Sequence, residues 1–553
     1  MKKLKFGVAL GIIFWLPVLG VFAQKSALNV PFDMPKINIP VFKTDTFNIE
    51  RFGAVKDGFT LNTQAFAKAI EACSEKGGGT VLVPAGLWLT GPILLKSNVN
   101  LHIEKGALVL FSRNIDDYPL VNTFYEGLST MRCQSPISGE GLENVAITGE
   151  GVLNGSGEVW RPVKKSKLTE FQWNTLVKSG GVVDSDGVTW FPSEKSRKGN
   201  NLSTNGYLGS NAKTEDYMAI KDFLRPVMLD LVRCKNILLD EVTFQNSPSW
   251  CLHPFMCEHL TLRSVKVINP WYAQNGDGID IESCRIGSLD KCTFDAGDDA
   301  ICIKSGRNEE GRKRNMPTEF FTITNCVVYH GHGGFVIGSE MSGGARNLFV
   351  SNCTFIGTDV GLRFKTTRGR GGIVEKIYIS DINMINIPTD AIGFDMYYGG
   401  NSPVPEPDEK VVEVPKETTV PEVSEGTPQF RDFYIRNIFC NGADRAIFLQ
   451  GLPEMSIKNI NLENISIKAN TGFTCIEGDQ ISLKNVKLEV KKGNAAVISN
   501  GKNVALSDFK CIGYKGKMLK ISGKQTANIN LTNIGTLVDY EASEDVSPKV
   551  IIK

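Results

Sequence analysis

From about residue 237 onward, one short pattern recurs, in which apolar residues alternate with polar ones around a central polar position. Its copies include ILLDEVTF, LTLRSVKV, FTITNCVV, LFVSNCTF, IYISDINM, FYIRNIFC, INLENISI, ISLKNVKL and VALSDFKC. Alternation with period two indicates strands, and a repeat of about 21–34 residues, with one gap about twice as long, suits a stack of strand-and-turn coils. We therefore predict an all-β fold, a right-handed single-stranded parallel β-helix.

Asparagine recurs at one position of this repeat. A side-chain amide has both a donor and an acceptor, so it can bond to equivalent amides on the coils before and after it. We therefore predict an internal ladder of stacked amides at a turn, formed by Asn325, Asn352, Asn437, Asn464 and Asn485.

A second strand lies between successive copies of the repeat, and its apolar pairs set a register. Alternate residues of a strand face opposite sides, so each pair marks two inward positions. We align as consecutive coils the pairs Trp250/Leu252, Ile279/Ile281, Ile301/Ile303, Phe335/Ile337, Leu362/Phe364 and Ile392/Phe394. In this register one outward column contains His253, Glu282, Lys304, Gly338, Lys365 and Asp395.

Carboxylates gather where these strands begin. Asp277 and Asp299 each lie two residues before an inward pair and therefore stack on neighbouring coils, while Asp298 stacks with His332. An ionised carboxylate buried in an apolar coil costs several kcal/mol unless it is paired. We expect the surrounding glycines to permit a turn that directs these side chains outward, onto one patch of the surface. The basic neighbours of this patch are Arg363, Lys365 and Lys304.

Composition excludes some classes of partner. The chain has 553 residues, 42% of them hydrophobic and 22% charged, and a formal net charge of +1. This balance gives no overall attraction to nucleic acid or to a membrane surface, and we expect neither as a partner. The 13 cysteines are too few for a disulfide scaffold in a chain of this length. We expect buried free thiols where cysteines fall within apolar strands, as at Cys292, Cys326 and Cys353.

The N-terminus has the pattern of a signal peptide over residues 1–23. Three lysines precede a long apolar run, and small residues near Ala23 indicate cleavage before Gln24. The mature protein is then exported, to the periplasm or outside the cell. No later apolar run is long enough to span a bilayer.

Residues 24–553 are expected to form one β-helix domain with two insertions, at about 155–222 and 400–428. Both segments are too long for ordinary turns. The first enters just before the coils with the carboxylates, so we expect it to wall off one end of a groove. The helix-like stretch at 65–73 is expected to cap the open end of the stack.

Four short motifs occur in order around the carboxylate patch: NGDG (275–278), GDDA (297–300), GHGG (331–334) and RFK (363–365). They resemble the signatures of glycoside hydrolase family 28, the polygalacturonases and their relatives, with Gly276 where many members have threonine. The resemblance covers most of residues 45–540 and also includes FGAVKDG (52–58), VPAGLWLTGPI (83–93) and FQNSPSW (244–250). The family fold is the parallel β-helix.

The resemblance implies a hydrolase that inverts the anomeric centre and uses no metal or other cofactor. By motif position, Asp298 is then the general acid, and Asp277 and Asp299 activate the water. His332 is expected to tune or orient the acid. Glycoside cleavage needs one protonated and one ionised carboxyl group, and crowding of like charges can keep a proton on one of them.

The resemblance also implies a pectic polysaccharide or oligogalacturonide as the substrate. Arg363 and Lys365 would bind the galacturonate carboxylate next to the cut bond, since a guanidinium can pair with a carboxylate through two hydrogen bonds. For His253 and Lys304, contact with substrate and structural hydrogen bonding both stay open. Aromatic residues at the next strand end are expected to stack on or hydrogen-bond to a sugar. These are Tyr397 and Tyr398.

Exo-acting cleavage from the non-reducing chain end is expected for two reasons. The first insertion can fold over the groove and carries residues able to hold a terminal uronate, among them Trp160, Arg161, Lys164 and Lys165. The stretch IGSEMSGG (337–344) also resembles exo-acting bacterial members more than endo-acting fungal ones.

Several alternatives remain at this stage. Within the family they are an endo-polygalacturonase and a rhamnogalacturonan hydrolase. Outside it they are a calcium-dependent pectate lyase, whose acidic cluster would bind the metal, and a non-catalytic polysaccharide-binding β-helix. Neighbouring coils are roughly 4.7–4.9 Å apart, nearer the short carboxyl separation of retaining enzymes, so the expectation of inversion rests on the family resemblance.

Overall fold

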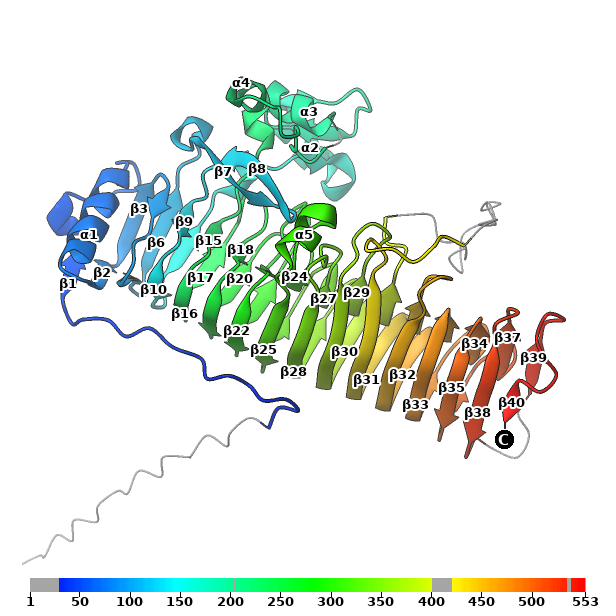
Figure 1. Cartoon of the computed structure of the whole chain (residues 1–553). Coiled ribbons are helices and arrows are strands. Elements are labelled where there is room, and N and C mark those ends of the chain that lie inside the picture. Colours follow the sequence, from blue (N-terminus) through cyan, green and yellow to red (C-terminus); the bar gives the residue numbers. More distant parts are fainter. Residues whose placement is uncertain (1–28, 203, 400–419, 535–538, 553) are drawn as a thin grey trace, which may run out of the picture.

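The computed structural model describes residues 29–202, 204–399, 420–534 and 539–552. They form an elongated parallel β-helix, which confirms the fold predicted from the repeat (Figure 1). Helix α1 (Thr63–Glu75) covers the N-terminal end of the stack through its buried residues, which include Phe66 and Ile70. This position matches the cap expected at 65–73.

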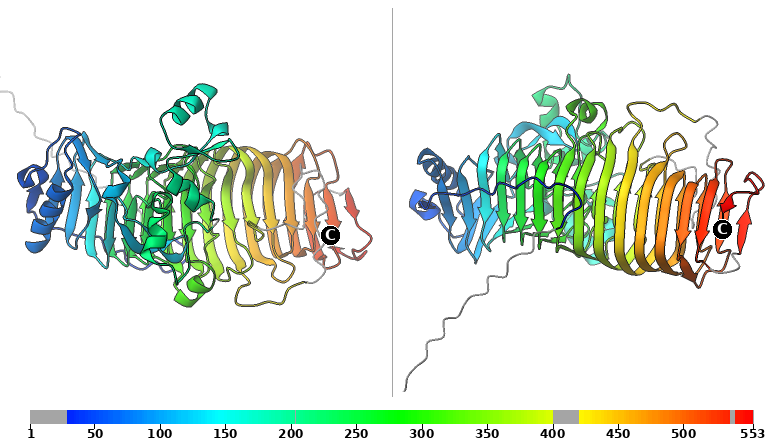
Figure 2. Two further views of the ribbon diagram at one scale, coloured as in Figure 1. Left: turned by 90° about the horizontal axis from the view of Figure 1, so that it is seen from above. Right: turned by 60° about the horizontal axis from the view of Figure 1, so that its bottom comes forward.

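In the described residues, three ladders of parallel strands surround the core, and we name them faces A, B and C (Figure 2). Face A contains β4 (Ile93–Leu94), β9 (Ile137–Glu140), β15 (Leu229–Val232), β18 (Leu252–Phe255), β21 (Ile279–Glu282), β24 (Ile301–Lys304), β27 (Gly333–Ile337), β29 (Val360–Lys365), β34 (Ala496–Ser499), β37 (Leu519–Ser522) and β39 (Tyr540–Ala542). Face B contains β1 (Thr46–Asn48), β2 (Gly79–Val83), β5 (Val99–Ile103), β10 (Glu143–Thr148), β16 (Lys235–Asp240), β19 (Glu258–Arg263), β22 (Arg285–Asp290), β25 (Thr318–Thr324), β35 (Lys502–Ser507), β38 (Ala527–Thr532) and β40 (Ile551–Ile552). Face C contains β3 (Gly86–Thr90), β6 (Ala107–Phe111), β11 (Val152–Asn154), β17 (Thr243–Gln245), β20 (Lys266–Ile268), β23 (Thr293–Asp295), β26 (Val327–Val328) and β36 (Lys510–Ile512).

Longer strands turn from one face to the next and belong to more than one ladder. They are β28 (Ala345–Ile356), β30 (Ile373–Asp395), β31 (Gln429–Gln450), β32 (Ile457–Ile476) and β33 (Gly478–Glu489).

The register of face A confirms most of the predicted alignment. Ile279 pairs with Ile301, Ile301 with Phe335, and the pairing continues to Leu362 and Ile392. The first step of the prediction is wrong, because Ile279 pairs with Leu252 and not with Trp250. A shift of two residues keeps the same side chains inward, so the apolar pattern alone cannot detect it.

The predicted asparagine ladder is present at the turn between faces B and C, but it lies on the exposed surface and not inside the coil as expected. Asn352 donates to Asn325 at 2.5 Å, Asn464 to Asn437 at 3.1 Å, and Asn485 to Asn464 at 2.8 Å. Each of these residues has a φ between 52° and 58°, in the left-handed region that asparagine tolerates better than most residues. One residue type therefore satisfies both the backbone and the amide stacking.

Two excursions leave the coil on the side of face A (Figure 1). Between β11 and β15 the chain forms a small antiparallel sheet and three helices, where an insertion was expected. These elements are β12 (Val163–Lys164), β13 (Val182–Val183), β14 (Thr189–Phe191), α2 (Glu170–Lys178), α3 (Glu194–Asn200) and α4 (Thr214–Met218). The second excursion, a hairpin of β7 (Leu120–Tyr125) and β8 (Leu128–Cys133), was not predicted.

The hairpin did leave a signal in the sequence. Two stretches rich in β-formers flank Glu126 and Gly127, whose φ values of 49° and 78° are those of a two-residue hairpin turn.

Other predictions concern the termini and the cysteines. The signal peptide at 1–23 lies outside the described residues, as does most of the insertion at 400–428, of which only 420–428 are described. Among the described residues, no helix has the length and apolar character needed to cross a membrane. Cys292, Cys326 and Cys353 are buried free thiols, as predicted.

Candidate active site

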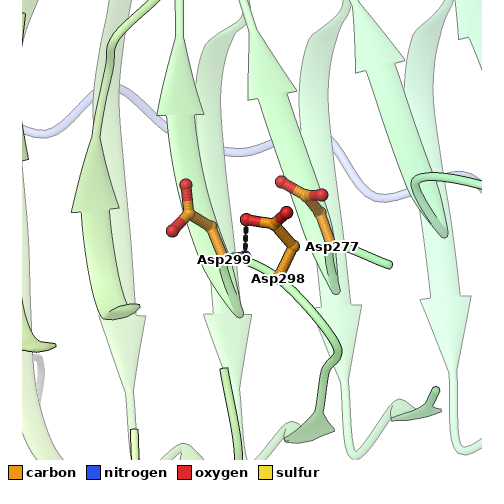
Figure 3. A group of neighbouring side chains, drawn as sticks. All are labelled: Asp277, Asp298 and Asp299. Atoms are coloured by element: carbon orange, nitrogen blue, oxygen red, sulfur yellow. Dashed lines mark hydrogen bonds between the residues drawn. The ribbon is translucent and has the colours of Figure 1, made fainter. Parts of the chain in front are cut away.

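Three aspartates meet at the beginning of two neighbouring strands of face A. Asp277 precedes β21, while Asp298 and Asp299 precede β24, and Figure 3 shows Asp298 between the other two. One carboxylate oxygen of each lies within 4.8 Å of the others. The turn needs Gly297, because a Cβ there would lie 2.4 Å from the carbonyl oxygen of Ala273. A close backbone approach, and not an unusual φ, therefore explains this glycine.

Asp299 is kept ionised by two basic side chains, Arg363 and Lys365. Its side chain is 2% exposed, and its oxygens accept from Arg363 Nη1 at 3.0 Å and from Lys365 Nζ at 2.6 Å. Burial alone would raise the pKa of this carboxyl, but the charges of Lys365, Arg363 and Lys304 bring the pKa well below its ordinary value. Asp299 is thus the carboxylate of the cluster that stays charged.

Asp277 has the opposite character. It is 3% exposed, and burial, together with the charges of Asp280, Asp298 and Asp299, raises its pKa well above the ordinary value. Two carboxyl groups in one cluster therefore have their pKa values moved in opposite directions, so the cluster can hold a proton and a negative charge at once.

His332 lies at the solvent side of the cluster. Its Nδ1 is 3.0 Å from Asp298 Oδ1, and its Nε2 is 3.8 Å from Asp359 Oδ2. The hydrogen bond to Asp298 raises the pKa of the imidazole, although burial opposes it. Asp298 is the most accessible of the three aspartates, with a side chain that is 22% exposed.

A pocket of about 240 Å³ opens beside the cluster. Its floor contains Asp277, Asp298, Asp299, Lys304 and Lys365, and its wall contains Glu126, Asn205, Arg307, Glu340, Arg370 and Tyr398. The wall is built from distant segments. Glu126 at the hairpin tip accepts from Arg307 at 2.8 Å and from Asn205 at 2.8 Å.

The hairpin blocks face A on the N-terminal side of the pocket. Tyr125 stacks on Trp250 with ring centroids 4.9 Å apart, and Phe124 packs on Phe255 at 4.4 Å. Thr123 donates to Asp230 at 2.7 Å, so the contact with the outer surface of the coils is both apolar and polar.

The hairpin also bridges to α5 (Asn308–Arg314). The Ser129 N–H donates to Glu310 at 3.0 Å, and Arg314 donates to the Gly127 carbonyl at 3.3 Å. The closed end of the pocket is thus the hairpin held against α5.

Comparison with known proteins agrees with this geometry. The family model for glycosyl hydrolases family 28 matches residues 164–428. A "Probable polygalacturonase" of Vitis vinifera is 29% identical over 343 residues, covering 60% of this chain and 59% of the relative. An "Exo-poly-alpha-D-galacturonosidase" of Dickeya chrysanthemi is 28% identical over 407 residues, covering 72% of this chain and 64% of the relative.

A solved structure agrees over most of both chains. The crystal structure of a hyperthermoactive exopolygalacturonase from Thermotoga maritima is 27% identical, has a TM-score of 0.60, and covers 90% of this chain and 94% of that one. By the family-model match, residues 164–428 form a glycosyl hydrolase family 28 segment. The chain spans less than two thirds of the length of the first two relatives above.

Of the two alternatives left open for His253, substrate contact is wrong and structural hydrogen bonding is correct. His253 is 0% exposed, with Nδ1 3.4 Å from Asp230 and Nε2 3.0 Å from Glu282, so it cannot touch a substrate. It lies in the column of Asp280, two residues from the predicted position. Lys304 does line the pocket, although it is largely buried and donates to Glu340 at 2.8 Å.

The structure is consistent with the predicted sugar contact for one of the two tyrosines and not for the other. Tyr398 lines the pocket, with Lys365 Nζ 4.7 Å from its ring centroid. Tyr397 is 7% exposed and belongs to the hydrophobic core, which is inconsistent with a stacking role.

Two of the insertion residues expected to hold a uronate, Trp160 and Arg161, have structural contacts instead. Trp160 is buried against Tyr118, and Arg161 donates to the Ser247 carbonyl at 2.6 Å. The pocket wall instead receives Asn205 from the insertion and Glu126 from the hairpin.

Among the described residues, the three aspartates also form a group of side chains that could bind a cation. Asp299, however, already directs both oxygens to Arg363 and Lys365. A calcium ion prefers six to eight oxygen ligands, and here it would compete with two fixed cations for one of three carboxylates. The donor set is therefore a poor fit for a calcium site.

Proposed function

We propose that this chain is a secreted, exo-acting hydrolase that inverts configuration while cleaving α-1,4-galacturonosyl linkages of pectin. One observation carries the proposal. An ionised carboxylate, Asp299, and a more accessible carboxyl group, Asp298, lie together beside Arg363 and Lys365, at the floor of a pocket closed by the hairpin. Hydrolysis needs the two carboxyl groups, and binding of a uronate substrate needs the two basic side chains. Cleavage at a chain end needs the closed pocket.

In the proposed reaction, Asp298 donates its proton to the glycosidic oxygen as the bond to the anomeric carbon breaks. Asp299, kept ionised by Arg363 and Lys365, is the base that takes a proton from the attacking water, and Asp277, whose pKa is raised, helps to position that water through a hydrogen bond. His332 orients Asp298 through their 3.0 Å contact. Arg363 and Lys365 bind the carboxylate of the adjoining sugar while they hold Asp299.

The proposal of inversion rests on the match to family 28, because the close approach of the carboxylate oxygens is nearer to the short separation of retaining enzymes. Proton NMR of the first product tests it. The new reducing end should form as the β-anomer and then mutarotate. Initial formation of the α-anomer would mean retention.

Substrate and linkage are tested by product analysis on defined oligogalacturonides. We expect release of monomer, or of another short product, from the non-reducing end. Cleavage of rhamnogalacturonan fragments but not of galacturonan would assign the other family 28 activity. A lyase would give an unsaturated product and lose activity with a chelator, and a purely binding protein would release no sugar.

The exo mode is tested by replacing residues 122–131 with Gly-Ser-Gly, which removes the contacts of Phe124 and Tyr125. We expect products of many lengths and a faster fall in polymer viscosity, because the groove then continues toward β15. Removal of 185–187, an exposed turn of the insertion, is the control and should change neither measurement. Unchanged release of short products by the hairpin variant would refute this origin of the exo mode.

A further inference from the structure

We propose that the C-terminal coils carry a second, remote binding site for the polyuronate chain, a basic ridge on the edge of face A. The ridge is defined by Lys491, Lys492, Lys515 and Lys520. The inference rests on the proposed function, since it assigns a position to the part of the substrate that lies beyond the sugars at the active site.

The strand register connects the ridge with the active site. Arg363 pairs with Gly393, and the same column continues through Phe448, Thr474 and Val497 to Lys520. Five strand spacings separate the two ends, which is about 24 Å at ~4.8 Å per strand. Lys520 thus stands on the same outward line as the proposed carboxylate-binding arginine.

The other ridge lysines lie in the loops that lead into β34 and β37. These loops occupy the same edge of face A as the turns with Asp298 and His332, since all of them directly precede strands of that face. The loops also stack on each other, because the backbone N–H of Lys515 donates to the Gly493 carbonyl at 3.0 Å. Lys491 and Lys515 are exposed, and neither has an acidic partner among the described residues.

Charge is concentrated in this part of a nearly neutral chain. Residues 491–520 contain seven lysines and one acidic residue, Asp508, whereas the whole chain has a net charge of +1. Glu541 offsets Lys520 at 3.6 Å, and Asp539 offsets the neighbouring Lys517 at 2.8 Å. Lys502 donates to Gln525 at 2.7 Å. The exposed charges of Lys491 and Lys515, which have no acidic partner among the described residues, complement a polymer with one carboxylate per sugar.

The hairpin determines which way such a polymer extends. It blocks face A toward the N-terminal coils, so a chain whose end enters the pocket must leave over the coils that follow β29. Those coils lead to β34 and β37, the strands that follow the loops of the ridge (Figure 1).

The test compares Lys491→Gln/Lys515→Gln with the control Lys487→Gln/Lys510→Gln. The control lysines are also exposed and belong to the same coils, but they pair with each other in register on face C. The two variants therefore lose equal charge from different faces. Steady-state kinetics are measured at low salt on long polygalacturonate and on digalacturonide, which is too short to reach the ridge.

We expect the ridge variant to raise KM for the polymer about 3–10-fold, as two weak surface ion pairs would predict, with kcat on digalacturonide unchanged. The difference should disappear at high salt because exposed charges are screened. Equal KM values for the ridge and control variants on the polymer would overturn the proposed binding site. An equal loss of kcat/KM on polygalacturonate and on digalacturonide would also overturn it.

A second measurement separates this inference from the proposed function. If the wild-type protein cleaves no galacturonide, the proposed function fails. Retention of the ridge and control variants in gels containing polygalacturonate still tests the ridge. Weaker retention of the ridge variant alone would support it, and equal retention would refute it.

Discussion

Face A has the same strand geometry in its catalytic coils, β18 to β29, and in its C-terminal coils, β31 to β37, yet its outward positions differ. In the catalytic coils His253, Asp280 and Glu282 are fully buried. In the C-terminal coils Thr474 and Val497 are half-buried and Lys520 is exposed. The difference follows the cover. The hairpin and α5 lie over the catalytic coils, whereas in the C-terminal coils Phe448 is buried under Arg445 and the positions after it in the same column open progressively to solvent.

Burial of so many charges is tolerated because they are paired. His253 lies between two carboxylates, Lys304 contacts Glu340 and Asp280, and Asp299 binds two cations. Removal of one partner from a buried pair leaves an uncompensated charge, which costs far more than the loss of an exposed pair. The catalytic coils should therefore be sensitive to single substitutions that the C-terminal coils tolerate.

The largest effect is expected for Asp298→Asn. Asparagine can still accept the Asp299 N–H at 3.0 Å but cannot donate a proton as an acid, so turnover should fall by about 10²–10⁴-fold while the fold is retained. Asp295→Asn, three residues away on face C, is the control and should keep its activity. A folded Asp298→Asn protein with normal turnover would remove Asp298 from the mechanism.

The next largest effect is on stability. His253→Ala should lower the free energy of unfolding by about 3–5 kcal/mol at pH 6, because two buried carboxylates lose their cation. His330→Ala, which breaks an exposed pair with Asp295, should cost at most about 1 kcal/mol in the same urea titration.

This stability difference should depend on pH. Burial lowers the pKa of His253, but its bonds to Asp230 and Glu282 raise it to about 10. The group's folded pKa thus exceeds its unfolded value of about 6.5, so its contribution is complete below pH 6.5 and is lost as the pH rises through about 10. A gap between wild type and variant that stays constant up to pH 10 would contradict a buried imidazolium.

A smaller effect concerns the pH profile. Lys365→Met removes the cation that contributes most to lowering the pKa of Asp299, so the acidic limb of kcat/KM should move up by about 1–3 pH units. Lys487→Met, on the exposed side of face C, should leave the profile unchanged. If the acidic limb stays in place, an ionised Asp299 is not required.

The smallest effect belongs to the C-terminal coils. Asn464→Ala removes bonds to Asn437 and Asn485 and leaves alanine at a φ of 57°, which should cost about 1–2 kcal/mol. Asn464→Gly accepts that φ, so it should cost less. If both variants lower the melting temperature equally, the backbone conformation contributes nothing to the preference for asparagine in the ladder.

Much of the fold could be predicted from the sequence because a coil repeats its physical requirements. The alternation of Ile301 and Ile303 and the asparagines that recur at one turn depend on local geometry, which is similar from coil to coil. The order of the four motifs can be read directly from the sequence. These features gave the β-helix and brought Asp277, Asp298, Asp299 and His332 together.

Only the tertiary structure decided what covers the coils. Glu126 and Arg307 are 181 residues apart and meet at the pocket wall, and no periodicity relates them. The two-residue error at His253 has the same origin, because period two fixes which side a residue faces but not which coil position it occupies. The sequence by itself thus determined the scaffold and its catalytic motifs, while long-range packing of the hairpin decided which charges are buried and where the groove ends.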